Sequence, residues 1–326
     1  MRKLLTFLLL LGLAFGAWLG WGVLTPTAPS GQTFVLLRSG LTTRKIAGEL
    51  KAAGVIRSDK AFLVWHYFHR GRTLKAGEYR FEKAANIIEI HRRLARGDIY
   101  THTVVIPEGF TMFDIAQAVE QAGLGSRDDF LKVARSEVDL VHDLAPGATS
   151  LEGYLFPDTY EFTRTQSMHD IAAVMVHHFQ QVATAIGLSN DVQQTVTMAS
   201  IVEKETAAPE ERPLVASVYY NRLTKRMALD ADPSVIYAEL LTNTYQGALH
   251  HQDLQTNSRY NTYRFPGLPP GPIANPGKSA LEAAMHPAVS EYLYFVSDGN
   301  GHHRFAKSLE EHNRNVTAFR RALHRP

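Results

Sequence analysis

The chain has 326 residues, contains no cysteine and carries a formal net charge of +2 with histidine neutral. This length allows more than one folded domain. The absence of cysteine excludes disulfides, thiolate metal ligands and a cysteine nucleophile, and no basic block of the kind that binds nucleic acid stands apart from neighbouring acidic residues.

An apolar segment begins after the first three residues. Leu4–Leu24 contains no charged residue and has about the ~20 residues that a helix needs to cross a bilayer. Arg2 and Lys3 before it favour a cytoplasmic N-terminus. We therefore expect a single-pass membrane anchor, followed by a short linker at Thr25–Gln32. A cleaved signal peptide is the alternative, because small residues occur at Ala14–Ala17.

A repeat follows the linker. The segments Val35–Val55 and Val104–Leu124 align without a gap at an offset of 69 residues (104 minus 35). Each copy predicts a short β-strand, a turn at a glycine, and a threonine N-cap that opens an amphipathic helix. Modules of this kind resemble LysM-like folds, which bind cell-wall glycan in other proteins, whereas two scaffold modules without a ligand are the alternative. The identical pairs are Val35/Val104, Gly40/Gly109, Thr42/Thr111, Ile46/Ile115, Ala47/Ala116, Ala53/Ala122 and Gly54/Gly123.

Further elements are expected between the copies and after them. Lys75–Phe81 and Ile99–Ile106 read as strands, and Asn86–Gly97 reads as a helix. The segment Thr149–Phe162 is rich in aromatic residues around Pro157. Aromatic rings at this density either line a sugar-binding cleft or form core at a domain junction.

The segment from about Asp191 to Thr206 predicts a helix with an unusual end. Met198, Ile201 and Val202 share one apolar stripe, and Glu205 occupies its next position. Burial there, near the negative end of the helix dipole, would raise the pKa of Glu205 and suit a general acid. Glu203 lies on another side and reads as a supporting or surface charge. The alternative for Glu205 is an inert residue at a frayed helix end.

The C-terminal part contains further polar candidates. Asp230 and Asp232 precede a proline. A rigid Pro/Gly loop, Arg259–Gly277, contains Asn261, Tyr263 and Asn275, whose amides and hydroxyl would hydrogen-bond a polyol. After this loop, residues 291–313 predict a strand, a turn at Asp298–Gly299 and a second strand near 303–305, and a helix ends the chain.

These motifs are similar to those of the endolytic murein transglycosylase family, also called YceG-like. The likeness runs in order through about Thr149–Arg320 and is highly specific, because the Glu-Lys-Glu helix and the Pro/Gly loop occur together. The segments that carry it are Ala199–Thr206, Asp232–Tyr237, Tyr260–Tyr263, Gly267–Gly277 and Tyr292–His303.

The resemblance implies an α+β fold in four regions. These are a cytoplasmic tip and transmembrane anchor with the start of the linker in 1–27, a first small β/α module in 28–100, a LysM-like module in 101–148 and a catalytic domain in 149–326. It also implies a bacterial inner-membrane protein with a periplasmic catalytic domain, which acts on peptidoglycan glycan strands beside peptidoglycan synthases and needs no cofactor or metal.

The resemblance further implies a lytic cleavage of the bond between N-acetylmuramic acid and N-acetylglucosamine that leaves 1,6-anhydro ends. The family's catalytic acid aligns with Glu205. The substrate-binding candidates are Glu203, Asp232, Asn261, Tyr263 and Asn275.

Three other functions are compatible with parts of the sequence. A muramidase would hydrolyse the same bond and would use Asp230 or Asp232 as a second carboxyl group. A non-catalytic wall-binding protein would keep the anchor and the modules without any chemistry. A metal enzyme would draw on the histidines near His250–Asp253, His177–His178 and His302–His303, but adjacent histidines usually point apart, and no helical metal-binding pair occurs.

Overall fold

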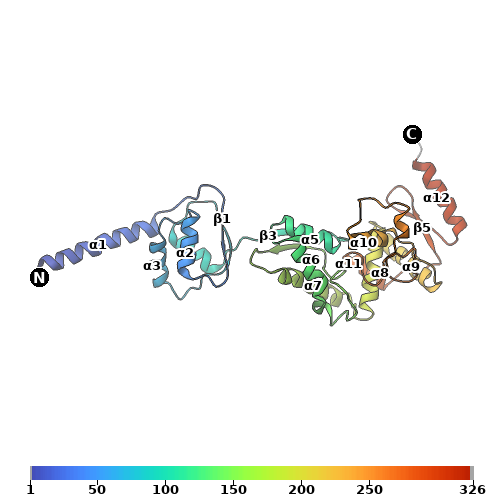
Figure 1. Cartoon of the computed structure of the whole chain (residues 1–326), viewed down its shortest axis with the longest axis horizontal. Coiled ribbons are helices and arrows are strands. Elements are labelled where there is room, and N and C mark those ends of the chain that lie inside the picture. The colour runs from blue at the N-terminus through green and yellow to red at the C-terminus, as the bar shows by residue number, and fades with distance from the viewer. Residues whose placement is uncertain (1, 324–326) are drawn as a thin grey trace. The chain divides into compact units, whose positions relative to one another are not determined.

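The structure is a computed structural model that describes residues 2–323. It has a mixed α+β architecture with an N-terminal apolar helix, which confirms these two parts of the expected fold (Figure 1). The chain forms two compact units. The first contains the residues up to Thr103 together with Glu161–Ser167, and the second contains Val104–Tyr160 and the residues from Met168 onward.

The first unit places helices against a two-stranded sheet. Its elements are α1 (Arg2–Leu24), β1 (Thr33–Leu37), α2 (Thr43–Ala52), α3 (Asp59–Phe68), β2 (Gly77–Phe81) and α4 (Ile87–Arg96). β1 and β2 are antiparallel, with Thr33 opposite Phe81 and Leu37 opposite Gly77. Fully buried side chains from both strands and from α2, α3 and α4 form one core. The end of α1 joins this core through Val23, and α1 contacts α3 and α4.

The helix α1 is long and apolar enough to cross a bilayer, and most of its side chains are exposed. Burial begins only at its C-terminal end, where Gly22 and Val23 meet the first unit. A soluble core helix would be buried along its length, so this exposure pattern is consistent with a single-pass anchor.

The second unit is mainly helical. Its helices are α5 (Met112–Gln121), α6 (Arg127–Ser136), α7 (Met168–Ala185), α8 (Val192–Glu205), α9 (Arg212–Thr224), α10 (Asp232–Thr242), α11 (Lys278–Met285) and α12 (Leu309–Leu323). Short 3₁₀ helices occur at Val138–Val141, Pro209–Glu211 and Asp253–Gln255. Its strands β5 (Tyr294–Ser297) and β6 (His303–Ala306) form an antiparallel hairpin. A further pair, β3 (His102–Val105) and β4 (Thr159–Phe162), contains residues of both units.

The helix α8 lies at the centre of this unit. It contacts α9, α10 and α11, and its residues 196–202 are buried on every side. The sequence predicted one apolar stripe, but small residues such as Ala199 and Ser200 let neighbouring segments approach the other faces as well. The central position of α8 fixes the side chains at its C-terminal end.

Both copies of the predicted repeat have the expected local structure. Thr42 and Thr111 are N-caps, and each accepts a hydrogen bond from the backbone N–H three residues later. Gly40 (φ 81°) and Gly109 (φ 77°) form the left-handed turns that favour glycine. The copies differ in their partners, because β1 pairs with β2 whereas β3 pairs with β4. The likeness of either module to a LysM fold stays a prediction.

The aromatic side chains of residues 154–162 belong to the core. Tyr154, Phe156, Tyr160 and Phe162 are all buried, and Tyr154 packs edge-on against Phe179 of α7 at 5.2 Å between ring centroids. Of the two interpretations of this segment, the structure favours the core.

Candidate active site

A cavity of about 410 Å³ opens at the C-terminal end of α8. It collects side chains from α8, α9, α10, α12, β5 and the loops before α10 and after residue 260. Its walls combine carboxyl groups, one guanidinium group and aromatic rings, which suit a polar ligand with apolar faces. The lining residues are Glu205, Tyr219, Arg222, Leu229, Asp230, Asp232, Tyr263, Tyr294, Phe295, Leu309 and His312.

Glu205 is the last residue of α8, and its carboxyl group lies in this cavity. The Tyr219 hydroxyl group of α9 donates a hydrogen bond of 2.8 Å to Glu205 Oε1. Because Tyr219 is itself 2% exposed, this bond holds the carboxyl group in one orientation. The other carboxylate oxygen accepts no hydrogen bond from the described residues.

The environment of Glu205 favours its protonated form. Its pKa is raised to about 7, mainly by burial; the Tyr219 hydrogen bond lowers the pKa, and the nearby negative charge of Asp232 contributes to the rise. Glu205 is half-buried, so the cavity gives a ligand access to the carboxyl group. The rise in pKa that the helix pattern predicted is confirmed, and burial is its main cause.

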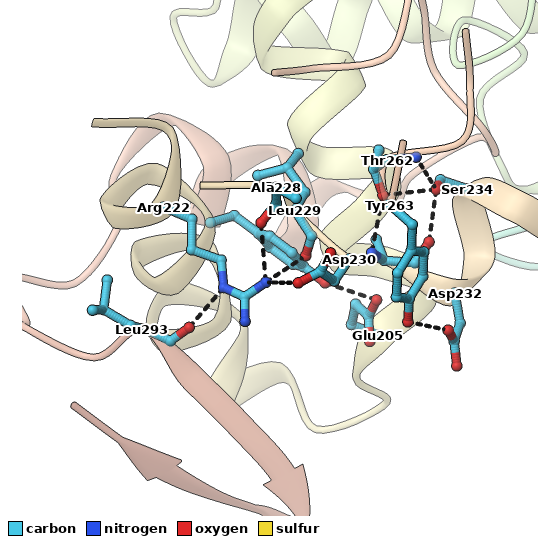
Figure 2. A network of polar contacts seen from close by, with 12 residues as sticks. Glu205, Arg222, Ala228, Leu229, Asp230, Asp232, Ser234, Thr262, Tyr263 and Leu293 are labelled. Atoms are coloured by element: carbon cyan, nitrogen blue, oxygen red, sulfur yellow. Dashed lines mark hydrogen bonds and ion pairs between the residues drawn. The ribbon is translucent and has the colours of Figure 1, made fainter. Parts of the chain in front are cut away.

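Arg222 of α9 organises one wall of the cavity (Figure 2). Its Nε donates to the carbonyl oxygen of Leu293 at 2.7 Å, and its Nη1 donates to the carbonyl oxygens of Ala228 and Leu229. The same Nη1 forms an ion pair of 2.9 Å with Asp230, a residue held at φ 52°. Arg222 therefore joins the loop before α10 to the start of the β5–β6 hairpin and neutralises Asp230.

Asp232 and Tyr263 form the opposite side of the site. The Tyr263 hydroxyl group donates a hydrogen bond of 2.6 Å to Asp232 Oδ1, and Figure 2 shows this pair beside Glu205. Asp232 is the first residue of α10, where the positive end of the helix dipole stabilises a carboxylate. The structure thus brings two of the predicted substrate-binding residues, Asp232 and Tyr263, into the same cavity as Glu205.

Glu203 does not line this cavity. Its side chain is 5% exposed and forms an ion pair of 2.7 Å with Arg212 of α9. It also accepts a hydrogen bond from the backbone N–H of Gly277 at 3.0 Å. The sequence suggested a supporting or surface charge, and the structure places Glu203 in a buried structural contact that holds the end of the Pro/Gly loop against α8.

Asn261 and Asn275 are both fully buried, and their amides bind protein groups. Asn261 donates to the carbonyl oxygens of Leu254 and Thr256. Asn275 accepts from the backbone N–H groups of Gly153 and Leu155, and it donates to Phe110 O and Glu152 Oε1. Neither amide lines the cavity, so we assign both to holding the loop. Their role as substrate-binding residues stays a prediction that this placement does not favour.

Sequence reasoning missed Tyr219 and Arg222, which contact or frame Glu205. The segment around them reads as an ordinary amphipathic helix, so only the crossing of α9 with α8 reveals their roles.

The histidine pairs considered as metal ligands have other contacts: His303 Nδ1 lies 2.7 Å from Glu211, and His178 Nδ1 lies 3.3 Å from Asp158. Within residues 2–323, no three His, Asp or Glu side chains form a group that could hold a metal ion.

Comparisons with known proteins agree on one family. A family model described as YceG-like matches residues 35–318. A protein of Bacillus subtilis (strain 168) named endolytic murein transglycosylase is 34% identical over 322 residues, which cover 92% of this chain and 89% of the relative. A protein with the same name from Streptococcus pneumoniae serotype 2 (strain D39) is 32% identical over 310 residues, and the match covers 85% of this chain but only 56% of that longer relative.

A solved structure supports the same relationship. The crystal structure of a yceG-like protein from Listeria monocytogenes is 33% identical in sequence and aligns with a TM-score of 0.57, covering 87% of this chain and 98% of that one. The family model spans most of the chain, and the Bacillus relative is matched over nearly its whole length. This chain therefore belongs to the YceG-like family.

Proposed function

We propose that this protein is a membrane-anchored endolytic murein transglycosylase, with Glu205 as its catalytic acid and base. The observation that carries the proposal is a single carboxyl group of raised pKa in the cavity at the end of α8, within a chain whose relatives bear this name. The substrate is the peptidoglycan glycan strand.

The chemistry needs one carboxyl group that changes its protonation state. Protonated Glu205 donates its proton to the glycosidic oxygen between N-acetylmuramic acid and N-acetylglucosamine, and that bond breaks as positive charge develops at the muramic C1. The resulting carboxylate takes the proton from the C6 hydroxyl group of the same sugar, whose oxygen bonds to C1. The product is a 1,6-anhydro end, and no water is consumed, because the nucleophile belongs to the substrate.

The remaining cavity groups have supporting roles in this proposal. Tyr219 orients the Glu205 carboxyl group through its 2.8 Å hydrogen bond. The carboxylate of Asp232 supplies negative charge that favours the developing positive charge on the sugar, whereas Arg222 neutralises Asp230. Tyr263 and Phe295 offer ring surfaces to the sugar rings, whereas the Tyr294 ring already packs against Arg222 and His312.

We also propose that α1 anchors the chain in the bacterial inner membrane with its N-terminus in the cytoplasm. The apolar length of α1, its exposed surface and the positive Arg2 and Lys3 support this orientation. The second unit would then act in the periplasm on strands that peptidoglycan synthases are still extending, and cleavage would end the elongation of those strands.

A muramidase is the second candidate, because Asp230 and Asp232 line the same cavity as Glu205. A hydrolase would use one of these carboxylates to activate water. Asp230 is already paired with Arg222, and Asp232 accepts the Tyr263 hydroxyl group, so neither is free of protein contacts. The ion pair with Arg222 weakens Asp230 as a general base, so a hydrolytic reaction would depend on Asp232.

The test is mass spectrometry of uncrosslinked glycan strands incubated with the full chain in detergent. We expect the native chain to release anhydromuramic ends and the Glu205→Gln variant to release none, while circular dichroism shows that the variant is folded. Glu203→Gln is the matched control from the same helix, and it should affect stability more than it affects the nature of the product.

Other products would change the assignment. Reducing ends, heavier by one water, would identify a hydrolase and direct attention to Asp230 and Asp232. Anhydro ends from Glu205→Gln would exclude Glu205 as the acid. Glycan binding by the folded native chain without any product would support the non-catalytic wall-binding protein.

A further inference from the structure

One face of the first unit combines exposed aromatic residues with unpaired positive charges. Tyr67 and Phe68 at the C-terminal end of α3 are 57% and 74% exposed. Arg70 lies over the Tyr67 ring, at 4.2 Å from its centroid. Two adjacent rings that are exposed to this extent leave apolar surface in contact with water, and aromatic and basic residues together are typical of segments at a membrane interface.

Three further arginines extend this face, Arg72 in the loop after α3 and two on α4, whose His91 Nε2 lies 3.0 Å from His66 Nδ1 of α3. Arg72, Arg92 and Arg96 are exposed and line a cavity of about 370 Å³ with Ala95. Among the described residues, none of these arginines, nor Arg70, forms an ion pair. Arg92 and Arg96 also line a second cavity with Glu82 and Glu89, but neither arginine is ion-paired within residues 2–323, and guanidinium groups that no carboxylate holds suit phosphate. We call Tyr67, Phe68, Arg70, Arg72, Arg92 and Arg96 the interfacial face.

The position of α3 relates this face to the apolar helix α1. A Cβ atom added to Gly22 of α1 would lie 3.0 Å from Ala61 of α3, so the two helices touch at the end of the apolar segment. Arg57, just before α3, lies over the Trp21 ring at 5.4 Å. Phe68 is seven residues beyond Ala61, which is about 10 Å along the helix. Figure 1 shows α3 along the edge of the unit where α1 enters, and β1 along the opposite edge.

We propose that the interfacial face docks on the bilayer surface beside α1, with Tyr67 and Phe68 in the headgroup region and the arginines bound to lipid phosphates. This inference rests on the membrane anchor in the proposed function and adds a second, independent contact with the same membrane. A single transmembrane helix can tilt in the bilayer together with the unit packed on its end, whereas a second contact fixes the orientation of both. The occupant is an anionic bilayer, because the face joins apolar rings to several positive charges and is continuous with the spanning helix.

The test uses the absence of cysteine from the chain. A Gly71→Cys variant of the full chain carries an environment-sensitive fluorophore between Arg70 and Arg72, at a position where an added Cβ meets no atom within 4 Å. Ser39→Cys, in the exposed turn after β1, is the matched control. Both are reconstituted in nanodiscs of phosphatidylcholine with or without phosphatidylglycerol, and lipids with a nitroxide near the headgroup serve as quenchers.

We expect a blue shift and quenching of the Gly71→Cys probe in the anionic discs, and neither for the Ser39→Cys probe. Phe68→Ser should reduce the quenching. Neutralising Arg72, Arg92 or Arg96 with glutamine should lower the ratio of docked to undocked units by about fivefold for each charge, whereas Arg38→Gln should not. Raising the salt concentration should have the same effect as these neutralisations.

The contrary results are distinguishable from a failure of the proposed function. If the chain floats with vesicles but the Gly71→Cys probe stays as exposed to water as the Ser39→Cys probe, the docking is wrong and the anchor stands. A blue shift without quenching by lipid would indicate a second copy of the chain on this face and would overturn the proposal. A chain that does not float with vesicles would overturn both the anchor and the docking, while the glycan assay would still report on Glu205.

Discussion

At the scale of the residue, Glu205 illustrates how position decides chemistry. Glu203 and Glu205 are two residues apart on one helix, and burial raises the pKa of both. Glu203 has Arg212 and the Gly277 N–H as partners, so it serves the fold. Glu205 has one neutral hydroxyl group as its partner and faces a cavity, so it can exchange a proton with a ligand.

The Tyr219 hydrogen bond makes a prediction about pH dependence. The reaction starts from protonated Glu205, so activity should fall as the pH rises through its pKa of about 7. The hydrogen bond from Tyr219 stabilises the carboxylate and lowers this pKa, so Tyr219→Phe should raise it and move the alkaline limb of the kcat/KM profile to higher pH. The Asp232 charge acts the other way, so Asp232→Asn should move the limb to lower pH.

The control for this measurement is Tyr220→Phe. Tyr220 is the next residue on α9, and its hydroxyl group donates to the carbonyl oxygen of Ala284 outside the cavity. Loss of the Tyr220 hydroxyl group should leave the alkaline limb of the kcat/KM profile at the same pH. An unchanged limb in Tyr219→Phe as well would mean that another group sets the pH dependence.

At the scale of the element, one buried network joins three segments that are far apart in sequence. The Asn275 amide binds the turn before α5, the 152–155 segment and the Glu152 carboxyl group. Glu152 also accepts from the backbone N–H of Met112 with both oxygens, at 3.0 and 2.9 Å. Burial raises the pKa of Glu152 to about 8, so the network contains a largely protonated carboxyl group near neutral pH.

Removing the Asn275 amide should therefore destabilise the second unit. Asn275→Ala leaves the backbone N–H groups of Gly153 and Leu155 without their acceptor, and each buried unsatisfied group costs roughly 1–3 kcal/mol. The Phe110 carbonyl group and the Glu152 carboxyl group each lose one donor but keep a backbone N–H partner. We expect a loss of roughly 3–5 kcal/mol in the free energy of unfolding, measured by urea denaturation.

Asn257→Ala provides the comparison for this substitution, because Asn257 is exposed in the loop before the Pro/Gly segment. It should change the free energy of unfolding by no more than about 0.5 kcal/mol. Equal stabilities of the two variants would show that the Asn275 network does not hold the loop.

The helices and strands that the sequence predicted have local sequence signals, and the helix that it did not predict lacks them. Capping threonines, glycine turns and alternating apolar residues predicted α2, α4, α5, α8 and the β5–β6 hairpin. The helix α10 was not predicted, because the carboxylates at its start and the proline in its first turn resemble a loop. Pro233 instead occupies the first turn, where the missing N–H costs nothing.

At the scale of the whole molecule, each unit has its own hydrophobic core. Leu94 of α4 and Leu281 of α11 are both fully buried, one in each unit. A leucine-to-alanine substitution in a core typically costs about 2–5 kcal/mol, through lost burial and the cavity that remains. The two substitutions should thus weaken different parts of the protein.

We expect Leu94→Ala to make the first unit sensitive to a protease while cleavage of soluble glycan strands by the second unit is retained. Leu281→Ala should do the reverse and reduce catalysis, because α11 packs on α8. Limited proteolysis with mass spectrometry, combined with the glycan assay, measures both effects. Loss of both units together in the Leu94→Ala variant would contradict independent cores.

The sequence by itself determined the apolar N-terminal helix, the repeated strand–turn–helix motif, the helix that ends at Glu205 and the family. Each of these depends on neighbouring residues: hydrophobic length, caps, turns and periodicity. Tertiary structure alone decided the partners of Glu205, the burial of Glu203, Asn261 and Asn275, and the different strand pairing of the two repeat copies. A side chain's environment is created by segments that are distant in sequence, so periodicity can assign a residue to a helix face but cannot name the groups that it meets.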